Sequence, residues 1–155
     1  MPEFPSYIQV HVYRLNNGAT EHLILRRAPN EKDYPDMMQV VTGAIEQSET
    51  ADNAALRELQ EELGVQPIEC HVLPIINSFY HARRHTITHS VVFAARIDLH
   101  TEIKLSHEHS EYFWCSPEEA EQKLIMPSHI QSVKILCEYM LNEEKKKYLT
   151  RITLP

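Results

Sequence analysis

The sequence predicts an α/β fold of the α+β kind, in which helices flank a mixed β-sheet. Segments with strand character and segments with helical character interleave along the chain, which favours one layered architecture with a shared core. At least two of the connections between strands are short, as in hairpins, so the sheet is not purely parallel. The length of 155 residues suits one compact domain, and we expect residues 1–155 to form it.

Stretches rich in β-branched, aromatic and aliphatic residues, bounded by turn residues, predict the strands of this sheet. Asn17 and Gly18 separate the first two and are typical of a hairpin turn. A basic turn over residues 80–85 separates the two longest. The predicted strands cover residues 7–15, 22–27, 38–41, 67–79, 86–97 and 111–115.

Three helices are predicted. Residues 50–63 are rich in Ala, Leu, Glu and Arg, which are strong helix formers, and Gly64 follows where a C-terminal cap belongs. Ser116 and Ser128 are each placed to cap a shorter helix. The second of these carries apolar residues at helical spacing, which predicts a stripe that faces the core: Ile130, Val133, Cys137 and Met140.

Residues 145–155 are charged and then apolar, and we treat them as a possible tail. The apolar side chains of Leu149, Ile152 and Leu154 fit a homodimer contact or a frayed end, and the sequence leaves both open.

The composition limits the classes of binding partner and the cellular compartment that we expect for the protein. A formal net charge of −7 disfavours nucleic acid and membrane surfaces as partners, because both attract clustered Lys and Arg. The three cysteines are odd in number and widely spaced, which indicates free thiols and a reducing, cytoplasmic setting. Residues 1–5 lack the basic start and apolar stretch of a secretory signal, and no apolar run is long enough to cross a bilayer.

The helix over residues 50–63 carries Glu58, Glu61 and Glu62 at spacings of three and four, which places them on one face. Two interpretations fit such a face. One is an ordinary solvated acidic surface. The other is a site for a hard divalent cation, because Mg²⁺ and Mn²⁺ prefer clustered carboxylate oxygens and join them to an anionic phosphate substrate. The opposite face is small and apolar and is expected to pack on the sheet: Ala51, Ala55, Leu59 and Leu63.

The segment from Gly43 to Val65 resembles the signature of the Nudix hydrolase family, of the MutT type. It matches at each constrained position and at the spacing between them: Gly43, Glu49, Arg57, Glu58, Leu59, Glu61, Glu62, Gly64 and Val65. The resemblance implies an α/β/α sandwich with a mixed sheet. It also implies divalent-metal-dependent attack of water on a diphosphate linkage, with Mg²⁺ as the cofactor and Mn²⁺ as an alternative.

The resemblance also implies a role for each position. Glu58, Glu61 and Glu62 look like the metal ligands, and Glu58 or its neighbour Glu61 looks like the group that helps deprotonate the attacking water. Arg57 looks like the partner of Glu49 that holds the loop against the helix, which is also what a purely structural ion pair would do. A backbone carbonyl near Gly43 is implied as a further ligand.

Two positions depart from the family pattern. Many members have a second glycine where this chain has Thr42, and a glycine where it has Ser48. Neither change removes a carboxylate, and we expect only a stiffer loop. Later in the chain, Glu108 looks like the additional glutamate that the family often brings to the metal cluster, in preference to Glu111. An ordinary polar turn is the other interpretation.

Substrate choice depends on residues outside this segment. Gln39–Gly43, together with the stretch from Glu108 to Trp114, is similar to the bacterial dihydroneopterin triphosphate and deoxyadenosine triphosphate pyrophosphatases, although Met38 stands where these usually have tryptophan. That similarity implies a nucleoside or pterin triphosphate as substrate, with a monophosphate and pyrophosphate as products. Four arginines are candidate phosphate binders, each also explicable as a solvated side chain: Arg26, Arg27, Arg83 and Arg84.

Other functions stay open. Tyr80 lies at a spacing reminiscent of the hydrolases of dinucleoside polyphosphates, and nucleotide sugars are a further class of substrate. Some proteins with this fold are non-catalytic regulatory modules that bind a nucleotide. Such modules commonly lose carboxylates of the signature, and this chain has lost none.

Overall fold

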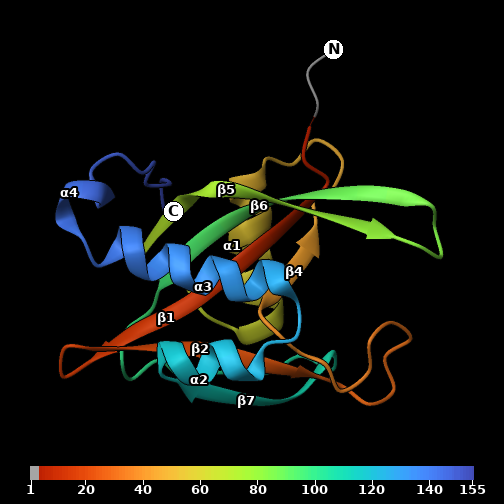
Figure 1. Cartoon of the computed structure of the whole chain (residues 1–155), viewed down its shortest axis with the longest axis horizontal. Helices are drawn as coiled ribbons and strands as arrows, with labels where there is room; N and C mark the ends of the chain where they lie inside the picture. Colours follow the sequence, from red (N-terminus) through yellow and green to blue (C-terminus); the bar gives the residue numbers. More distant parts are fainter. Residues whose placement is uncertain (1–3) are drawn as a thin grey trace.

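The computed structural model of the chain describes residues 4–155, so the start of the N-terminal stretch discussed above lies outside the described residues. It has three layers (Figure 1). A seven-stranded mixed sheet forms the middle layer. Helix α1 (Ala51–Leu63) covers one face, and α3 (Pro127–Met140) covers the other. The predicted class, a mixed sheet flanked by helices, is confirmed.

Strand β1 (Tyr7–Asn16) lies at the centre of the sheet. On one side it runs parallel to β6 (Thr86–Arg96), which makes the sheet mixed. Two antiparallel strands share its other edge: β4 (Val41–Ala44) pairs with the first half and β2 (Ala19–Arg27) with the last four residues. The second half of β2 therefore continues away from β1 (Figure 1).

The second half of β2 forms the other part of the divided sheet. It pairs with β7 (His109–Cys115) and with β3 (Met38–Gln39). Beyond β6, the antiparallel strand β5 (Glu69–His81) completes the order, and the β5–β6 hairpin projects past the other strands (Figure 1). The predicted single strand over residues 38–41 is wrong, because the chain changes partner from β2 to β1 at Val40.

The alternation of β1 determines which helix each side chain meets. Ile8, Val10 and Val12 are buried in the cluster that includes Leu59 and Leu63 of α1. On the opposite face, Tyr13 packs in a separate cluster with residues of β6 and with Leu136 and Met140 of α3. A third cluster lies under α2 (Pro117–Lys123), next to α3.

The helix ends follow from local chemistry. The Thr50 side chain accepts a hydrogen bond from the Asn53 backbone at the start of α1, and Gly64 ends the helix with φ 66°, as predicted. Ser116 forms the predicted capping box of α2. The predicted Ser128 cap is wrong: α3 begins at Pro127, after Met126, with no side-chain cap. Proline is pre-organised for the first helical position, so the helix starts earlier and includes Ser128.

The tail is part of the fold. It contains a short helix, α4 (Glu143–Lys146), and then lies beside β5. The Val72 amide donates to the Thr150 carbonyl and the Ile152 amide donates to the Cys70 carbonyl, each at 2.9 Å. Ile152 is 4% exposed, in the same cluster as α1. The frayed end is therefore excluded, and Ile152 is not free for a dimer contact.

Within residues 4–155, no helix is long and apolar enough to span a membrane. The three cysteines are free thiols, with Cys70 and Cys115 buried and Cys137 half-buried.

Candidate active site

The loop before α1 is fastened to the helix by one arginine. Arg57 Nε donates to Glu49 Oε1 at 2.8 Å and Nη2 donates to Glu49 Oε2 at 3.0 Å, which is a bidentate pair. The same Nη2 donates to the Ala44 carbonyl at 2.9 Å. These bonds keep the pKa of Glu49 below its ordinary value. The loop from β4 to α1 is thus held at both of its ends, as the Arg57–Glu49 pairing implied.

Glu58 lies against the backbone of β4. A Cβ atom added to Gly43 would stand 2.2 Å from the carboxyl carbon of Glu58, so a side chain at position 43 would occupy the space of this carboxylate. Glu58 is 9% exposed. Burial, and then the charges of Glu61 and Glu62, raise its pKa, while Arg57 opposes this shift. A carboxylate in this environment favours a nearby cation.

Arg57 supplies the positive charge among the glutamates in this structure. Its Nη1 donates to Glu58 Oε1 at 2.8 Å and to Glu61 Oε2 at 3.2 Å, and the Glu61 side chain is 55% exposed. Within the described residues, no three His, Cys, Asp or Glu side chains converge closely enough to hold a metal ion. The three glutamates of the signature are instead divided, with Glu62 bonded elsewhere.

Glu62 is held by a loop that lies far away in the sequence. Ser106 Oγ donates to Glu62 Oε2 at 2.7 Å, and His109 Nδ1 lies 3.1 Å from the same oxygen. The loop is fixed to the end of α1, because the Ser106 amide donates to the Glu62 carbonyl and the Lys104 amide donates to the Leu63 carbonyl. These carbonyls would otherwise lack partners at the end of a helix.

The same loop brings Glu108 to the glutamate cluster. Burial, and then the charges of Glu62 and Glu31, raise the pKa of Glu108, so the carboxylates are near enough to affect one another. The Glu108 carbonyl accepts from the Ala28 amide at 2.8 Å, which ties the loop to the end of β2. Glu111 lies elsewhere, 3.0 Å from Arg26 across the β2–β7 pair. Glu108, and not Glu111, therefore lies near Glu62, and its role as a metal ligand stays a prediction.

The two departures from the family pattern have different consequences. Ser48 has φ 65°, a left-handed conformation that favours glycine. The backbone at Ser48 therefore keeps the left-handed conformation that glycine favours, although the residue is a serine. Thr42 lies in β4, opposite Gln9 of β1, and lines a neighbouring pocket.

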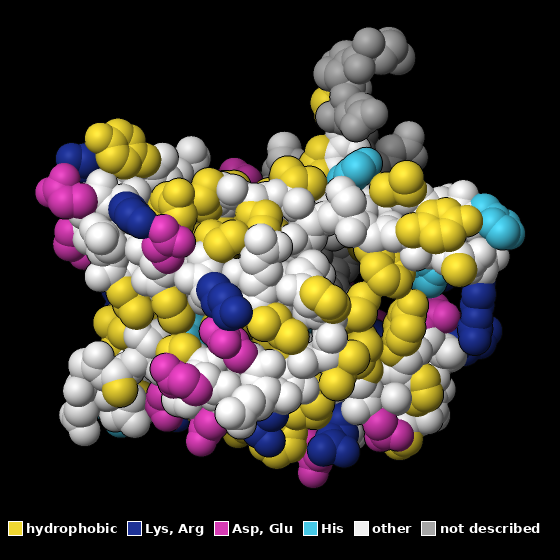
Figure 2. Space-filling view, viewed as in Figure 1, with side chains coloured by type: hydrophobic (Ala, Val, Ile, Leu, Met, Phe, Trp, Pro, Cys, Tyr) yellow, Lys and Arg dark blue, Asp and Glu magenta, His cyan; other side chains and the backbone are white. Residues whose placement is uncertain are grey.

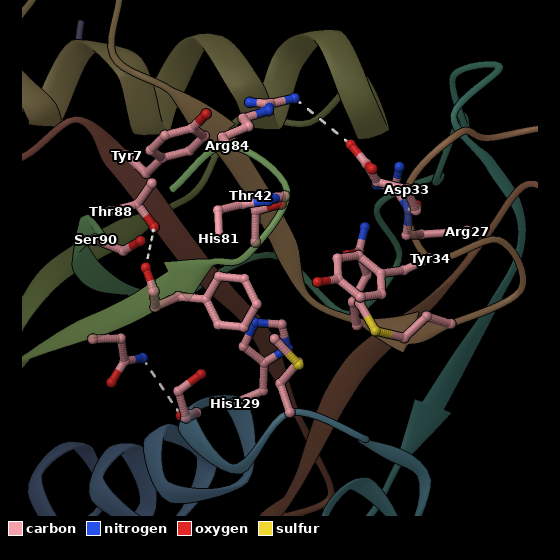
Figure 3. A pocket seen from close by; sticks show the side chains of 16 residues that line it. Tyr7, Arg27, Asp33, Tyr34, Thr42, His81, Arg84, Thr88, Ser90 and His129 are labelled. Carbon is pink, nitrogen blue, oxygen red and sulfur yellow. Dashed lines mark hydrogen bonds and ion pairs between the residues drawn. The ribbon is translucent and has the colours of Figure 1, made fainter. Parts of the chain in front are cut away.

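A pocket of about 240 Å³ opens beside β4, between the β5–β6 hairpin, the start of α3 and the loop after β2. Figure 2 shows a hollow rimmed by hydrophobic side chains on this face. Tyr34 and Phe79 line it, with their rings edge to face and their centroids 6.5 Å apart. Gln39 and Thr42 line it from the side of the signature loop (Figure 3 labels Thr42). The pocket and the glutamate cluster are therefore neighbours across β3 and β4.

A buried hydrogen-bond network supports the pocket from beneath α3. Asn77 Nδ2 donates to Gln9 Oε1 at 2.9 Å and to Ser132 Oγ at 3.1 Å, and Ser132 Oγ donates to the Ser128 carbonyl at 2.8 Å. His129 also lines the pocket, where burial lowers its pKa to about 4 and keeps the ring neutral near pH 7. The inner wall of the pocket is thus polar, uncharged and fixed.

The candidate phosphate binders are divided by the structure. Arg27 lines the pocket, but it donates to the Asp33 carbonyl at 2.8 Å and pairs with Glu31 at 3.2 Å, so it holds the loop after β2. Arg84 lies at the mouth of the pocket, 3.7 Å from Asp33 (Figure 3), and Arg83 lies 3.8 Å from the same carboxylate.

The other two candidates, Arg26 and Tyr80, are engaged with neighbouring side chains. Arg26 pairs with Glu111 on the surface of the sheet. The Tyr80 hydroxyl lies 3.1 Å from His85 Nδ1, and Tyr80 is 56% exposed on the hairpin. Substrate binding by the four arginines and Tyr80 stays a prediction.

The sequence alone does not identify the residues that reach the glutamates from other segments. Ser106 and His109 contact Glu62, and Gln39 contacts His109; none has a role assigned from the sequence, although Gln39 and His109 both lie in the stretches that carry the subfamily resemblance. Tyr34, Phe79 and Asn77 were read only as loop or strand residues. Their positions around a pocket depend on contacts between distant segments, which no local pattern reveals.

The comparison with known families decides the identity. A model of the NUDIX domain matches residues 6–136. The chain belongs to the Nudix family. Its CTP pyrophosphohydrolase relative from Escherichia coli (strain K12) is 32% identical over 108 residues, which are 70% of this chain and 76% of that protein. The Nudix chain described here is accordingly a hydrolase that acts on diphosphate linkages.

Solved Nudix structures have the same fold. A NUDIX hydrolase from Listeria monocytogenes superposes with a TM-score of 0.78 at 24% identity, over 91% of this chain and 97% of that one. The dihydroneopterin triphosphate pyrophosphohydrolase of E. coli superposes with a TM-score of 0.70 at 24% identity, over 85% and 96%. At this identity the likeness establishes the fold of the Nudix chain and leaves its substrate to be argued from the site.

Proposed function

We propose that this protein hydrolyses a nucleoside or pterin triphosphate to the monophosphate and pyrophosphate, with Mg²⁺ as its metal and Mn²⁺ as an alternative. One observation carries the proposal: the contact between Glu58 and Gly43, which brings a buried carboxylate to the backbone of the strand that also borders the pocket. The names of two similar proteins, a CTP pyrophosphohydrolase and a dihydroneopterin triphosphate pyrophosphohydrolase, support a triphosphate as substrate.

The donor atoms present suit a hard divalent ion, and the glutamates that stand apart among the described residues would have to converge around it. Glu58, Glu61 and Glu62, with Glu108 from the loop and the carbonyl near Gly43, form a set of oxygen donors of the kind that Mg²⁺ prefers. Burial, and then the charges of Glu61 and Glu62, raise the pKa of Glu58, and a bound cation would offset both effects. When bound, such an ion neutralises phosphate charge and makes water more acidic.

The reaction itself requires a nucleophile, a base and a fixed phosphate. Water attacks a phosphorus atom of the α–β linkage, and the bond from that phosphorus to the bridging oxygen breaks. We assign the proton from the water to Glu58 or Glu61; Glu58 is buried, and the Glu61 side chain is 55% exposed. Arg57 and Glu49 hold the loop against the helix, so their role is to position the other residues of the site.

The pocket accounts for the non-phosphate part of the substrate. Its volume of about 240 Å³ is smaller than that of pockets that enclose a whole ligand, so it suits a ring system alone. Tyr34 and Phe79 offer aromatic surfaces to such a ring, and neutral groups such as Asn77 and His129 offer hydrogen bonds. Arg84 at the mouth is the candidate contact for the phosphate chain, in exchange for Asp33.

We further propose that the protein works in the cytoplasm. The support is its three free thiols, two of which are buried, since such thiols persist in a reducing compartment. Its partner is then a small phosphorylated metabolite and not a nucleic acid, because the net charge of −7 repels polyanions.

The test is product identification. Purified protein with Mg²⁺ is incubated with CTP, dATP, dihydroneopterin triphosphate, a dinucleoside tetraphosphate and a nucleotide sugar. Glu61→Gln removes a proposed ligand with little change in size, and Glu144→Gln on α4, whose side chain is 84% exposed, is the matched control. We expect pyrophosphate from a triphosphate, lost in Glu61→Gln and kept in Glu144→Gln.

Other outcomes would change the assignment. Cleavage of the nucleotide sugar or the dinucleoside tetraphosphate alone would move the substrate to that class. Equal nucleotide binding by wild type and Glu61→Gln, without turnover of any compound, would overturn the proposal in favour of a binding module.

A further inference from the structure

A buried chain of side chains connects the pocket to the glutamate cluster. Gln39 Nε2 lies 2.9 Å from His109 Nε2, and His109 Nδ1 lies 3.1 Å from Glu62 Oε2. All three residues are buried, with exposed fractions of 4%, 6% and 5%. The proposed reaction assigns no role to Gln39 or His109. Both are polar groups in a place where burial without partners would destabilise the fold.

The hydrogen bonds of this chain have one consistent direction. An ionised carboxylate only accepts, so His109 Nδ1 carries the proton that is donated to Glu62. The Gln39 amide nitrogen only donates, so His109 Nε2 accepts from it. The histidine is thereby held from both sides, and its ring orientation is fixed.

Both donors to Glu62 act on the same oxygen. Ser106 Oγ and His109 Nδ1 bond to Oε2, whereas no described residue donates a hydrogen bond to Oε1. The Glu62 carboxylate is therefore held through Oε2, and Oε1 is available to bind a cation. It is the arrangement expected of a ligand that is oriented by its surroundings before a cation binds.

We propose that His109, itself held by Gln39, is a positioning residue that orients Glu62 so that its free oxygen serves the metal site. The proposal rests on the proposed function, because it takes Glu62 as a ligand. It adds a contact from the pocket side of the molecule: Gln39 lines the pocket, so the same chain connects the ring site with the metal site.

Two substitutions test the two hydrogen bonds of the His109 ring separately. His109→Asn places an amide donor near the position of Nδ1 and keeps a bond to Glu62. His109→Gln extends past that position towards Nε2, so it keeps a group near Gln39 and loses the donor to Glu62. Both remove the ring, so both lower stability for the same packing reason. The difference between them therefore reports the bond to Glu62.

The experiment is a Mn²⁺ titration of the full-length protein, followed by the electron paramagnetic resonance signal of free Mn²⁺, with steady-state kinetics alongside. We expect His109→Gln to weaken Mn²⁺ binding about 10-fold or more. His109→Asn should restore most of this loss. In His109→Gln the activity should recover at high metal concentration with an unchanged KM for substrate, because the defect lies in the metal site.

His22→Gln is the control. His22 is also buried, at 1% exposure, and contacts Cys137 and none of the glutamates of the signature. It should lower thermal stability and leave Mn²⁺ affinity unchanged. Gln39→Met, which removes only the outer donor, should weaken Mn²⁺ binding less than His109→Gln does.

The outcomes distinguish the two proposals. Wild-type protein that binds no Mn²⁺ and cleaves no substrate would overturn the proposed function. Wild type that binds Mn²⁺, with equal affinity in His109→Gln, would overturn the positioning role alone. Equal weakening by His109→Gln, His109→Asn and His22→Gln would show general loss of packing and would also overturn it.

Discussion

The contact between Gly43 and Glu58 makes Gly43→Ala the most informative single change. The added Cβ would meet the Glu58 carboxyl carbon and Oε1 at 2.2 Å, and ordinary contact begins at 3.4 Å. One of the two groups must therefore move by about 1.2 Å, the difference between these distances. The backbone of β4 is held by its pairing with β1, so we expect the Glu58 side chain to be the group that moves.

Displacement of about 1 Å at a reacting centre costs roughly 100-fold in rate. We therefore expect kcat/KM of Gly43→Ala to fall about 100-fold, with a loss of about 1–3 kcal/mol in the free energy of unfolding from the added volume. The assays are initial rates of pyrophosphate release at saturating Mg²⁺ and urea unfolding at the same pH.

Gly18→Ala is the matched control. Gly18 has φ 80° and nothing within 4 Å of an added Cβ, so alanine is strained there without a clash. It should lose about 1 kcal/mol of stability and keep full activity. Wild-type kcat/KM in Gly43→Ala, at equal metal concentration, would refute the argument that this contact places Glu58.

Three further predictions concern stability and are checked by denaturant titration. Burial lowers the pKa of His22 and of His129 to about 4, so the unfolded chain binds protons more readily than the folded one. The free energy of unfolding should therefore have its full value above pH 6.5. It should fall as the pH drops towards 4, by up to about 3 kcal/mol per histidine. Arg57→Lys keeps the charge but loses the bidentate bond to Glu49, which should lower the free energy of unfolding by about 1–2 kcal/mol. Ile152→Ala should lower it by about 2–5 kcal/mol, because the side chain is buried in the main core; no change would mean that the tail is dispensable.

Local patterns predicted much of the fold. The hairpin at Gly18, the cap at Gly64 and the capping box at Ser116 depend on residues within one turn of each other, and the structure contains all of them. The errors lie where a distant partner decides. The strand over residues 38–41 is divided because its two halves pair with different strands, and Val40 is the point of exchange.

The position of the tail also depends on distant partners, so the sequence of the tail does not predict it. Residues 145–155 have no strong periodicity, so the sequence left them between a dimer contact and a frayed end. Their place is decided by the β5 edge, where Thr150 and Ile152 complete backbone hydrogen bonds, and by the core cluster in which Ile152 is buried. Neither partner is visible from the tail itself.

The chemistry and the selectivity of this protein are encoded differently along the chain. The parts that act on the diphosphate lie between Gly43 and Val65, so a contiguous pattern identifies them. His109, which orients Glu62, lies 47 residues away from it in the sequence. Gln39, which orients His109, lies 70 residues away from that histidine. The pocket draws its lining from several strands, two loops and the start of α3. A substitution can therefore alter the ring that is accepted without touching the signature, which is why the reaction class follows from the sequence and the substrate has to be argued from the assembled site.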